Sequence, residues 1–355
     1  MIESLIRPHL RKFTPYSSAR SEMVNTDEAA ARRVYLDANE LSLGSPVSIA
    51  NVQLNRYPDP LQTVLRGELA GRNNVPSENL FVGVGSDEVI DLLVRLVCEP
   101  GKDNIVVVEP TYGVYRVSAD LNNIRVISVQ LDAEFQINAD AVLAAVTPDT
   151  KIVFCCSPNN PTGNVLRKQD VIRLAQSLQC LLVVDEAYGE FADQSLLLSG
   201  REAETYENIV LLKTLSKAWG LAGIRLGYCI AAPLIVDYLL RIKPPYNINA
   251  VTSHLAADAL VNERFMNEAV AIVRSERAKL ATALTSSPLV ARVYPSDANF
   301  ILAEFNNAGS VYDALLAKGF VVRRRSEPRL RSCLRITVGT PEENKTLLHH
   351  LGELV

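Results

Sequence analysis

The strongest constraint on the fold is an alternation of short apolar runs with longer amphipathic stretches across residues 86–241. Amphipathic stretches such as 87–96 and 171–179 separate several of the runs. Strands that are apolar on both faces and separated by helices predict a mainly parallel sheet covered on both sides, an α/β fold. Functional side chains then gather at the carboxyl ends of the strands. The apolar runs are residues 105–108, 124–129, 152–155, 181–184, 209–212 and 226–230.

The character of the chain changes at Pro244 and Pro245, which break a continuing helix and mark a predicted domain boundary. After it, residues 251–286 have apolar positions at helical spacing, and a predicted helix at 311–318 separates later strands at 300–304, 321–323 and 334–338. We expect an N-terminal segment 1–45 that packs on a small domain. A large domain would follow at 46–245, and a small C-terminal α+β domain at 246–355.

Composition excludes several classes of protein. The 355 residues suffice for two domains, and 48% hydrophobic with 21% charged residues is an ordinary globular balance. The formal net charge of -4 argues against a nucleic-acid partner. No apolar run reaches membrane-spanning length, and the first residues lack the apolar core of a secretory signal. Six cysteines without a C-x-x-C pair indicate reduced thiols in a cytoplasmic protein. The four histidines have no metal-ligand spacing, so we expect no metal.

The most informative motif surrounds Lys217, which closely follows the predicted strand 209–212. The hydroxyls of Thr214 and Ser216 flank it, and Arg225 follows eight positions later. This pattern suits an amine that attacks an aldehyde while hydroxyls and a guanidinium hold a phosphate. The alternative is a solvated lysine beside a glycine-rich turn.

A second motif places Asp185 directly after the apolar strand 181–184, with Tyr188 three positions later. A carboxylate at such a strand end can keep a pyridine nitrogen protonated. Taken alone, Asp185 is more typical of a helix N-cap.

Three further segments carry weaker signals. Asn160 lies in a loop fixed by two prolines and a glycine, which otherwise indicates only a tight turn. Gly85, Ser86 and Asp87 begin an amphipathic helix, where free amides and the helix dipole favour an anion, although many helices begin this way. Tyr112 follows strand 105–108, where it either stacks on a planar ring or packs in a turn.

Together and in this order, the five segments resemble the fold-type I aminotransferases, which use pyridoxal 5'-phosphate. The resemblance runs from about residue 35 to residue 338 and implies a large domain with a seven-stranded sheet plus a smaller α+β domain. It implies that Lys217 carries the cofactor as a Schiff base and that Asp185 pairs with the pyridine nitrogen. Tyr188 and Asn160 would contact the phenolic oxygen, and Tyr112 would stack on the ring. The implied phosphate-binding residues are Gly85, Ser86, Thr214, Ser216 and Arg225, and Asp87 is a further implied cofactor-binding residue.

Segments 14–16, 36–40, 55–58, 243–247 and 334–339 look like the histidinol-phosphate branch of that family. In this branch the tyrosine matching Tyr57 reaches the cofactor phosphate of the partner subunit, which implies a homodimer. The implied substrate-binding residues are Tyr16, Asn39, Arg323 and Arg335. A guanidinium at Arg335 can grip a carboxylate with two parallel hydrogen bonds.

The resemblance implies transamination between L-histidinol phosphate and 2-oxoglutarate, giving imidazole-acetol phosphate and L-glutamate, in histidine biosynthesis. An aromatic amino-acid aminotransferase and a threonine-phosphate decarboxylase are the alternatives inside the superfamily. A catalytically silent pyridoxal-phosphate-binding regulator would need an appended DNA-binding domain, for which neither terminus has room. A nicotinamide dehydrogenase is rejected, because Gly83 and Gly85 lack the later glycine of G-x-G-x-x-G.

Overall fold

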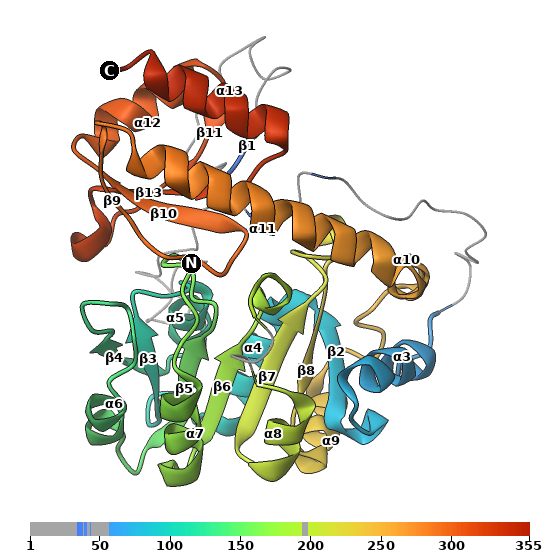
Figure 1. Ribbon diagram of the computed structural model, residues 1–355. Helices are drawn as coiled ribbons and strands as arrows, with labels where there is room; N and C mark the ends of the chain where they lie inside the picture. Colours follow the sequence, from blue (N-terminus) through green and yellow to red (C-terminus); the bar gives the residue numbers. More distant parts are fainter. Residues whose placement is uncertain (1–33, 38, 41–42, 44–56, 194–197) are drawn as a thin grey trace, which may run out of the picture.

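The computed structural model describes residues 34–37, 39–40, 43, 57–193 and 198–355. Within this part of the chain a seven-stranded sheet and a smaller four-stranded sheet lie one above the other (Figure 1), and residues 34–35 and 320–321 form a separate two-stranded sheet. Tyr16 and most of the predicted segment 1–45 lie outside the described residues. The predicted domain limits stay a prediction.

The large sheet has the strand order β2-β8-β7-β6-β5-β3-β4. β8 is antiparallel to both of its neighbours, and the other pairs are parallel, so the predicted mainly parallel sheet is confirmed. β2 was not predicted, because its glycine-containing run of five residues looks like the start of the following helix. The strands are β2 (Leu80–Val84), β3 (Asn104–Glu109), β4 (Arg125–Gln130), β5 (Thr150–Cys156), β6 (Leu181–Asp185), β7 (Ile209–Thr214) and β8 (Leu226–Ile230).

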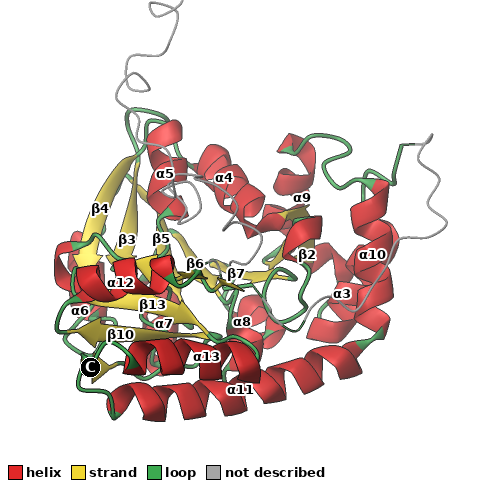
Figure 2. Cartoon of the chain, turned by 90° about the horizontal axis from the view of Figure 1, so that it is seen from above, coloured by secondary structure: helices red, strands yellow, loops and turns green. Residues whose placement is uncertain are grey.

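Helices cover both faces of this sheet, which explains its continuous apolar runs. Along β3, Ile105 and Val107 belong to one buried cluster, and Val106 and Val108 belong to another on the opposite face. The first cluster includes residues of α4 (Gly85–Val97), α5 (Val114–Leu121) and α9 (Pro233–Ile242), seen on one side of the sheet in Figure 2. The second includes residues of α3 (Thr63–Asn73), α6 (Ala139–Ala145), α7 (Lys168–Ser177), α8 (Gly200–Thr205), α10 (Ala250–Val261) and α11 (Glu263–Thr285).

The small sheet is antiparallel with the order β12-β13-β10-β9. The predicted strand 321–323 is wrong as a single element: it divides at Val322, because β11 pairs with β1 while β12 pairs with β13. Leu36, directly after β1, also contacts β13: its carbonyl accepts a 3.1 Å hydrogen bond from the Thr337 amide. The elements are β1 (Val34–Tyr35), β9 (Val290–Val293), β10 (Phe300–Phe305), α12 (Ala308–Ala317), β11 (Phe320–Val321), β12 (Arg323–Arg324), β13 (Cys333–Thr337) and α13 (Pro341–Gly352).

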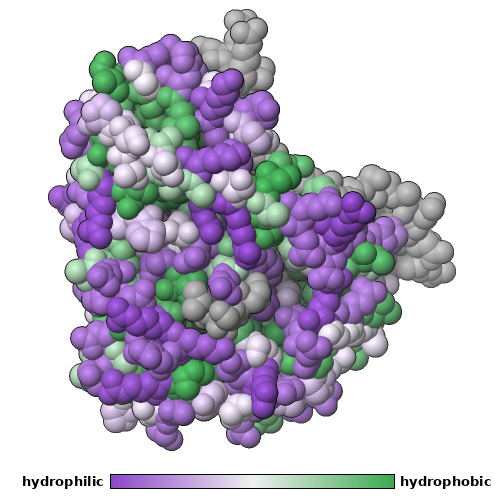
Figure 3. All heavy atoms as spheres, viewed as in Figure 1, coloured by the Kyte–Doolittle hydropathy of each residue, from purple (hydrophilic) through white to green (hydrophobic). Residues whose placement is uncertain are grey.

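The core is mainly apolar and the surface mainly polar, as in other globular proteins. Hydrophilic residues dominate the face in Figure 3, with scattered apolar patches. All six cysteines are free thiols and five of them are buried. Among the described residues, no helix has the length and apolar content needed to span a membrane.

Candidate active site

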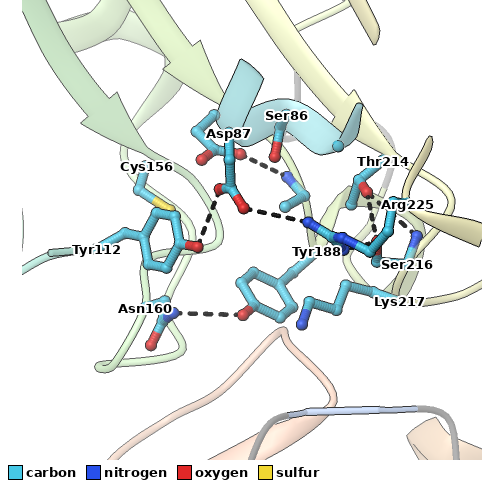
Figure 4. Close-up of a pocket in the computed structure, with 13 residues that line it drawn as sticks. Ser86, Asp87, Tyr112, Cys156, Asn160, Tyr188, Thr214, Ser216, Lys217 and Arg225 are labelled. Carbon is cyan, nitrogen blue, oxygen red and sulfur yellow. Dashed lines mark hydrogen bonds and ion pairs between the residues drawn. The ribbon is translucent and has the colours of Figure 1, made fainter. Parts of the chain in front are cut away.

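A cavity opens at the carboxyl ends of the central strands and brings the sequence motifs together (Figure 4). Every predicted cofactor-binding residue except Tyr57 lines it. Cys156 and Ala187 also line it and were not predicted. Cys156 is the last residue of β5 and Asp185 the last of β6, and the two lie side by side in the sheet. The tendency of site residues to lie at the carboxyl ends of parallel strands could therefore have indicated Cys156 as well. The full lining is Gly85, Ser86, Asp87, Tyr112, Cys156, Asn160, Asp185, Ala187, Tyr188, Thr214, Ser216, Lys217 and Arg225.

One end of the cavity is built around the N-terminus of α4. Gly85 has φ +71°, and a Cβ on it would lie 2.7 Å from Arg225 Nη2. Gly227 on β8 passes so close that its Cβ would lie 2.2 Å from the Ser86 amide nitrogen. Both positions therefore require glycine, and the helix start is held against β8 and Arg225.

Hydroxyls and a guanidinium surround this helix start. Thr214 Oγ1 donates to Ser216 Oγ at 3.1 Å, and Arg225 Nη1 lies 3.5 Å from the same oxygen. Arg225 Nη2 donates to Asp87 Oδ2 at 3.2 Å. Helix amides, two hydroxyls and an arginine at one point are the donors that a phosphate group requires.

Asp185 lies at the end of β6 with only 2% of its surface exposed. Its Oδ1 accepts from the Ala187 amide at 3.0 Å and its Oδ2 from the Tyr115 hydroxyl at 2.7 Å. Burial raises the pKa of Asp185 to about 6, and these two donors oppose the rise. A turn and a short 3-10 helix, Gly189–Phe191, follow Asp185, so the helix N-cap alternative does not hold.

Lys217 is half-buried, and its Nζ lies 5.7 Å from the centre of the Tyr188 ring (Figure 4). Burial, together with the nearby charge of Arg335, lowers the pKa of Lys217 to about 8. A larger fraction of the amine is then neutral near pH 7 than for a solvated lysine, which suits a nucleophile. The position of Lys217 in the cavity contradicts the alternative of a lysine in open solvent.

The Tyr188 hydroxyl joins the large sheet to the small one. It accepts from Asn160 Nδ2 at 3.3 Å and from Asn39 Nδ2 at 2.9 Å. Asn39 has a left-handed backbone, φ 55°, and its Oδ1 accepts from Thr337 Oγ1 on β13 at 2.9 Å. Burial raises the pKa of Tyr188 well above that of a free phenol, so its hydroxyl stays protonated and can donate.

The two predicted arginines lie on neighbouring strands of the small sheet, where Arg323 on β12 is the direct partner of Arg335 on β13. Directly opposed residues share a face of the sheet. Arg335 is buried, and it donates from Nη1 to Asn160 Oδ1 and from Nη2 to the Asp37 carbonyl, both at 2.6 Å. Arg335 therefore reaches from the small sheet to the loop after β5, beside the cavity.

Tyr57 lies apart from the other predicted residues. Its side chain is 82% exposed, and its ring stacks on Tyr246 with centroids 4.6 Å apart. Tyr57 does not line the cavity of its own chain, and its ring lies exposed on the surface of the molecule.

At the end of α13, potential ligand atoms of His349, His350 and Glu353 lie within 4.8 Å of one another. The sequence spacing did not indicate this group. Glu353 also pairs with Lys318 at 2.9 Å. The absence of a metal stays a prediction.

Comparison with known proteins decides the family. The model of the family described as aminotransferase class I and II matches residues 28–351. The chain belongs to this family. This aminotransferase is 45% identical over 348 residues to the histidinol-phosphate aminotransferase of Cytophaga hutchinsonii, covering 98% of this chain and 97% of the relative. It is 43% identical to that of Parabacteroides distasonis, covering 99% of both. The solved histidinol-phosphate aminotransferase of Sinorhizobium meliloti in complex with pyridoxal-5'-phosphate has a TM-score of 0.84 at 24% identity, covering 98% of this chain and 100% of that one. The predicted fold-type I architecture is confirmed.

Proposed function

We propose that this aminotransferase transfers the amino group of L-histidinol phosphate to 2-oxoglutarate, giving imidazole-acetol phosphate and L-glutamate, in histidine biosynthesis. Relatives with that name at 43–45% identity, matched over nearly their whole length, support the proposal. The structural observation that carries it is the facing pair Arg323 and Arg335, of which Arg335 donates to Asn160 in the lining of the cavity that holds Lys217. Two guanidinium groups on one face of a sheet suit a phosphate dianion.

Pyridoxal 5'-phosphate fits the cavity residues. Its phosphate would be held by the amides of Gly85 and Ser86 with Thr214, Ser216 and Arg225, at a point where two glycines leave no room for a Cβ. Asp185 would pair with the pyridine nitrogen, Tyr112 would stack on the ring, and Tyr188 and Asn160 would contact the phenolic oxygen. When bound, the cofactor supplies an electron sink for charge that develops on the substrate carbon.

Each catalytic side chain then has a defined task. Lys217 would hold the cofactor through its amine, and its free Nζ would take up the proton from the substrate carbon that carries the amino group and give it back later in the same half-reaction. Asp185, as a carboxylate, would hold a proton on the pyridine nitrogen. Tyr188 remains a hydrogen-bond donor because its hydroxyl is protonated.

Substrate recognition is assigned to Arg323, Arg335, Asn39 and Tyr16. The phosphate of one substrate and the second carboxylate of the other carry negative charge at a similar distance from the reacting carbon. The same arginines therefore serve both half-reactions.

A single half-reaction on the cofactor-loaded protein tests the substrate. L-histidinol phosphate, L-phenylalanine and L-threonine phosphate are added separately while the absorption of the cofactor is followed. We expect rapid conversion to the pyridoxamine form at low L-histidinol phosphate and slow conversion with the other two. A preference for L-phenylalanine would make this an aromatic amino-acid aminotransferase. Release of carbon dioxide from L-threonine phosphate would make it a decarboxylase.

We propose also that the enzyme is a homodimer in which Tyr57 completes the site of the partner subunit. Its exposed ring, held on Tyr246 outside its own cavity, supports this arrangement. Lys217→Ala and Tyr57→Ala should each be nearly inactive alone. Mixed dimers contain one site with both changes and one with neither, so mixing should restore activity. No gain after subunit exchange would contradict sharing of the site. A cytoplasmic location stays a prediction.

A further inference from the structure

We propose that Tyr115 is a positioning residue that keeps the Asp185 carboxylate ionised and directed into the cavity. The inference deepens the proposed function, because it concerns the side chain that pairs with the pyridine nitrogen. Tyr115 belongs to none of the five sequence motifs and does not line the cavity. Its role follows from its contacts.

The Tyr115 hydroxyl makes a short hydrogen bond to one oxygen of Asp185. The donor–acceptor distance is 2.7 Å to Oδ2, and the Ala187 amide donates to the other oxygen at 3.0 Å. Two donors on different oxygens fix the rotation of a carboxylate about its Cβ–Cγ bond. The carboxylate still has lone pairs available for a further donor, such as a protonated ring nitrogen.

The Tyr115 ring is held so firmly that the hydroxyl has little freedom. Its side chain is fully buried and stacks on Phe154 with centroids 4.7 Å apart and an interplanar angle of 12°. It also meets Tyr112 edge to face, at 5.6 Å and 84°. Tyr112 precedes α5 and Tyr115 lies in its first turn, so one helix start supports both the ring that lines the cavity and the donor to Asp185.

The charges around Asp185 show why such a donor is needed. Burial, with a smaller contribution from Asp87 on α4, raises the pKa of Asp185 to about 6. The Tyr115 hydroxyl, the Ala187 amide and Lys217 after β7 oppose this rise and keep the pKa from going higher. The Cys156 thiol at the end of β5 stays protonated because burial raises its pKa. Tyr115 itself cannot ionise near neutral pH, since burial and Asp185 raise its pKa, so it remains a donor throughout.

The substitution Tyr115→Phe removes the hydroxyl and keeps the ring that packs on Phe154. The first measurement is the dissociation constant of pyridoxal phosphate from the protein, determined by equilibrium titration between pH 5 and pH 9. We expect affinity to fall on the acid side as Asp185 takes up a proton. The midpoint of that fall should move upward by about one pH unit in Tyr115→Phe, the equivalent of one lost hydrogen bond. In steady-state assays kcat should fall and KM for the amino donor should stay constant.

Two further variants separate positioning from a general loss of structure. Tyr228→Phe removes another buried tyrosine hydroxyl, one that accepts from Asn73 outside the cavity lining, and should leave the midpoint in place. In an Asp185→Asn background, Tyr115→Phe should cause no shift, because the titrating carboxyl is gone. An unchanged midpoint in the single variant, or the same shift in either control, would overturn the inference. A parent protein that binds no pyridoxal phosphate would instead refute the proposed function.

Discussion

Replacing Gly227 with alanine tests how the helix start at Ser86 is built. The new Cβ would lie 2.2 Å from the Ser86 amide nitrogen, 2.5 Å from the Gly85 carbonyl carbon and 2.9 Å from Ser86 Cα. These are backbone atoms, so no side chain can turn away. The start of α4 must retreat from β8 by about 1 Å to reach ordinary contact, and overpacking of this kind costs about 1–3 kcal/mol.

The displacement has two measurable effects. An amide moved by about 1 Å no longer makes a hydrogen bond to a phosphate, and the loss of one such charged bond weakens cofactor binding about 10- to 100-fold. The free energy of unfolding of the cofactor-free protein should fall by about 1–3 kcal/mol. Equilibrium titration with pyridoxal phosphate and denaturant unfolding measure the two quantities.

Gly223→Ala is the matched control. Gly223 lies four residues earlier and has no atom within 4 Å of its added Cβ. Its substitution should leave both quantities within error of the parent. If Gly227→Ala bound the cofactor and unfolded like the parent, then close approach of β8 would not position the helix amides, and the account of the phosphate end would be wrong.

Three other predictions follow from the site and its surroundings. Arg323→Ala should raise KM for L-histidinol phosphate about 10- to 100-fold and KM for L-glutamate much less; equal losses would remove its assignment to the phosphate. The rate at which the cofactor-free protein binds pyridoxal phosphate should rise about tenfold between pH 7 and pH 9 and then level off. Only the neutral Lys217 amine attacks, and the pKa of that amine is lowered to about 8. A stopped-flow rate that does not change with pH would contradict this. Lys213→Met should cost about 3–5 kcal/mol in denaturant unfolding at pH 8, because the Glu186 carboxylate, 3.2 Å from Lys213, and half-buried Glu190 lose their counter-charge. The pKa of Glu186 is raised to about 7 by burial although Lys213 lowers it, so without Lys213 that pKa lies higher still; the loss should shrink as the pH falls toward 7 and level off below it, and a pH-independent loss would point to packing instead.

The cavity could be predicted because its residues follow a local rule. Each of Asp185, Asn160 and Lys217 comes soon after an apolar strand, and parallel strands bring such positions to one edge whatever the details of packing. The glycines at 83 and 85 likewise indicated an anion site at a helix start. These signals depend on a few neighbouring residues, so the order of the motifs along the chain was enough.

The features that the sequence did not predict depend on contacts between segments far apart in the chain. Tyr115 looks like an ordinary core residue of an amphipathic helix, and only the fold shows that its hydroxyl meets Asp185, 70 positions away. The ion pair of Lys213 and Glu186 crosses from β7 to the end of β6, 27 positions apart. The division of strand 321–323 depends on which partners β11 and β12 find, which no local pattern specifies.

The facing arginines on β12 and β13 have a consequence for redesign. The side chains assigned to the cofactor come from the large sheet and its loops, while Arg323 and Arg335 come from the small sheet. A hydrogen bond between Arg335 and Asn160 joins the two sets. Under the proposed assignment, the two arginines that meet the substrate phosphate lie on one antiparallel strand pair, apart from the strands that hold the cofactor. Exchanging this strand pair while keeping a donor to Asn160 should change the amino compound that the enzyme accepts and retain the shared chemistry.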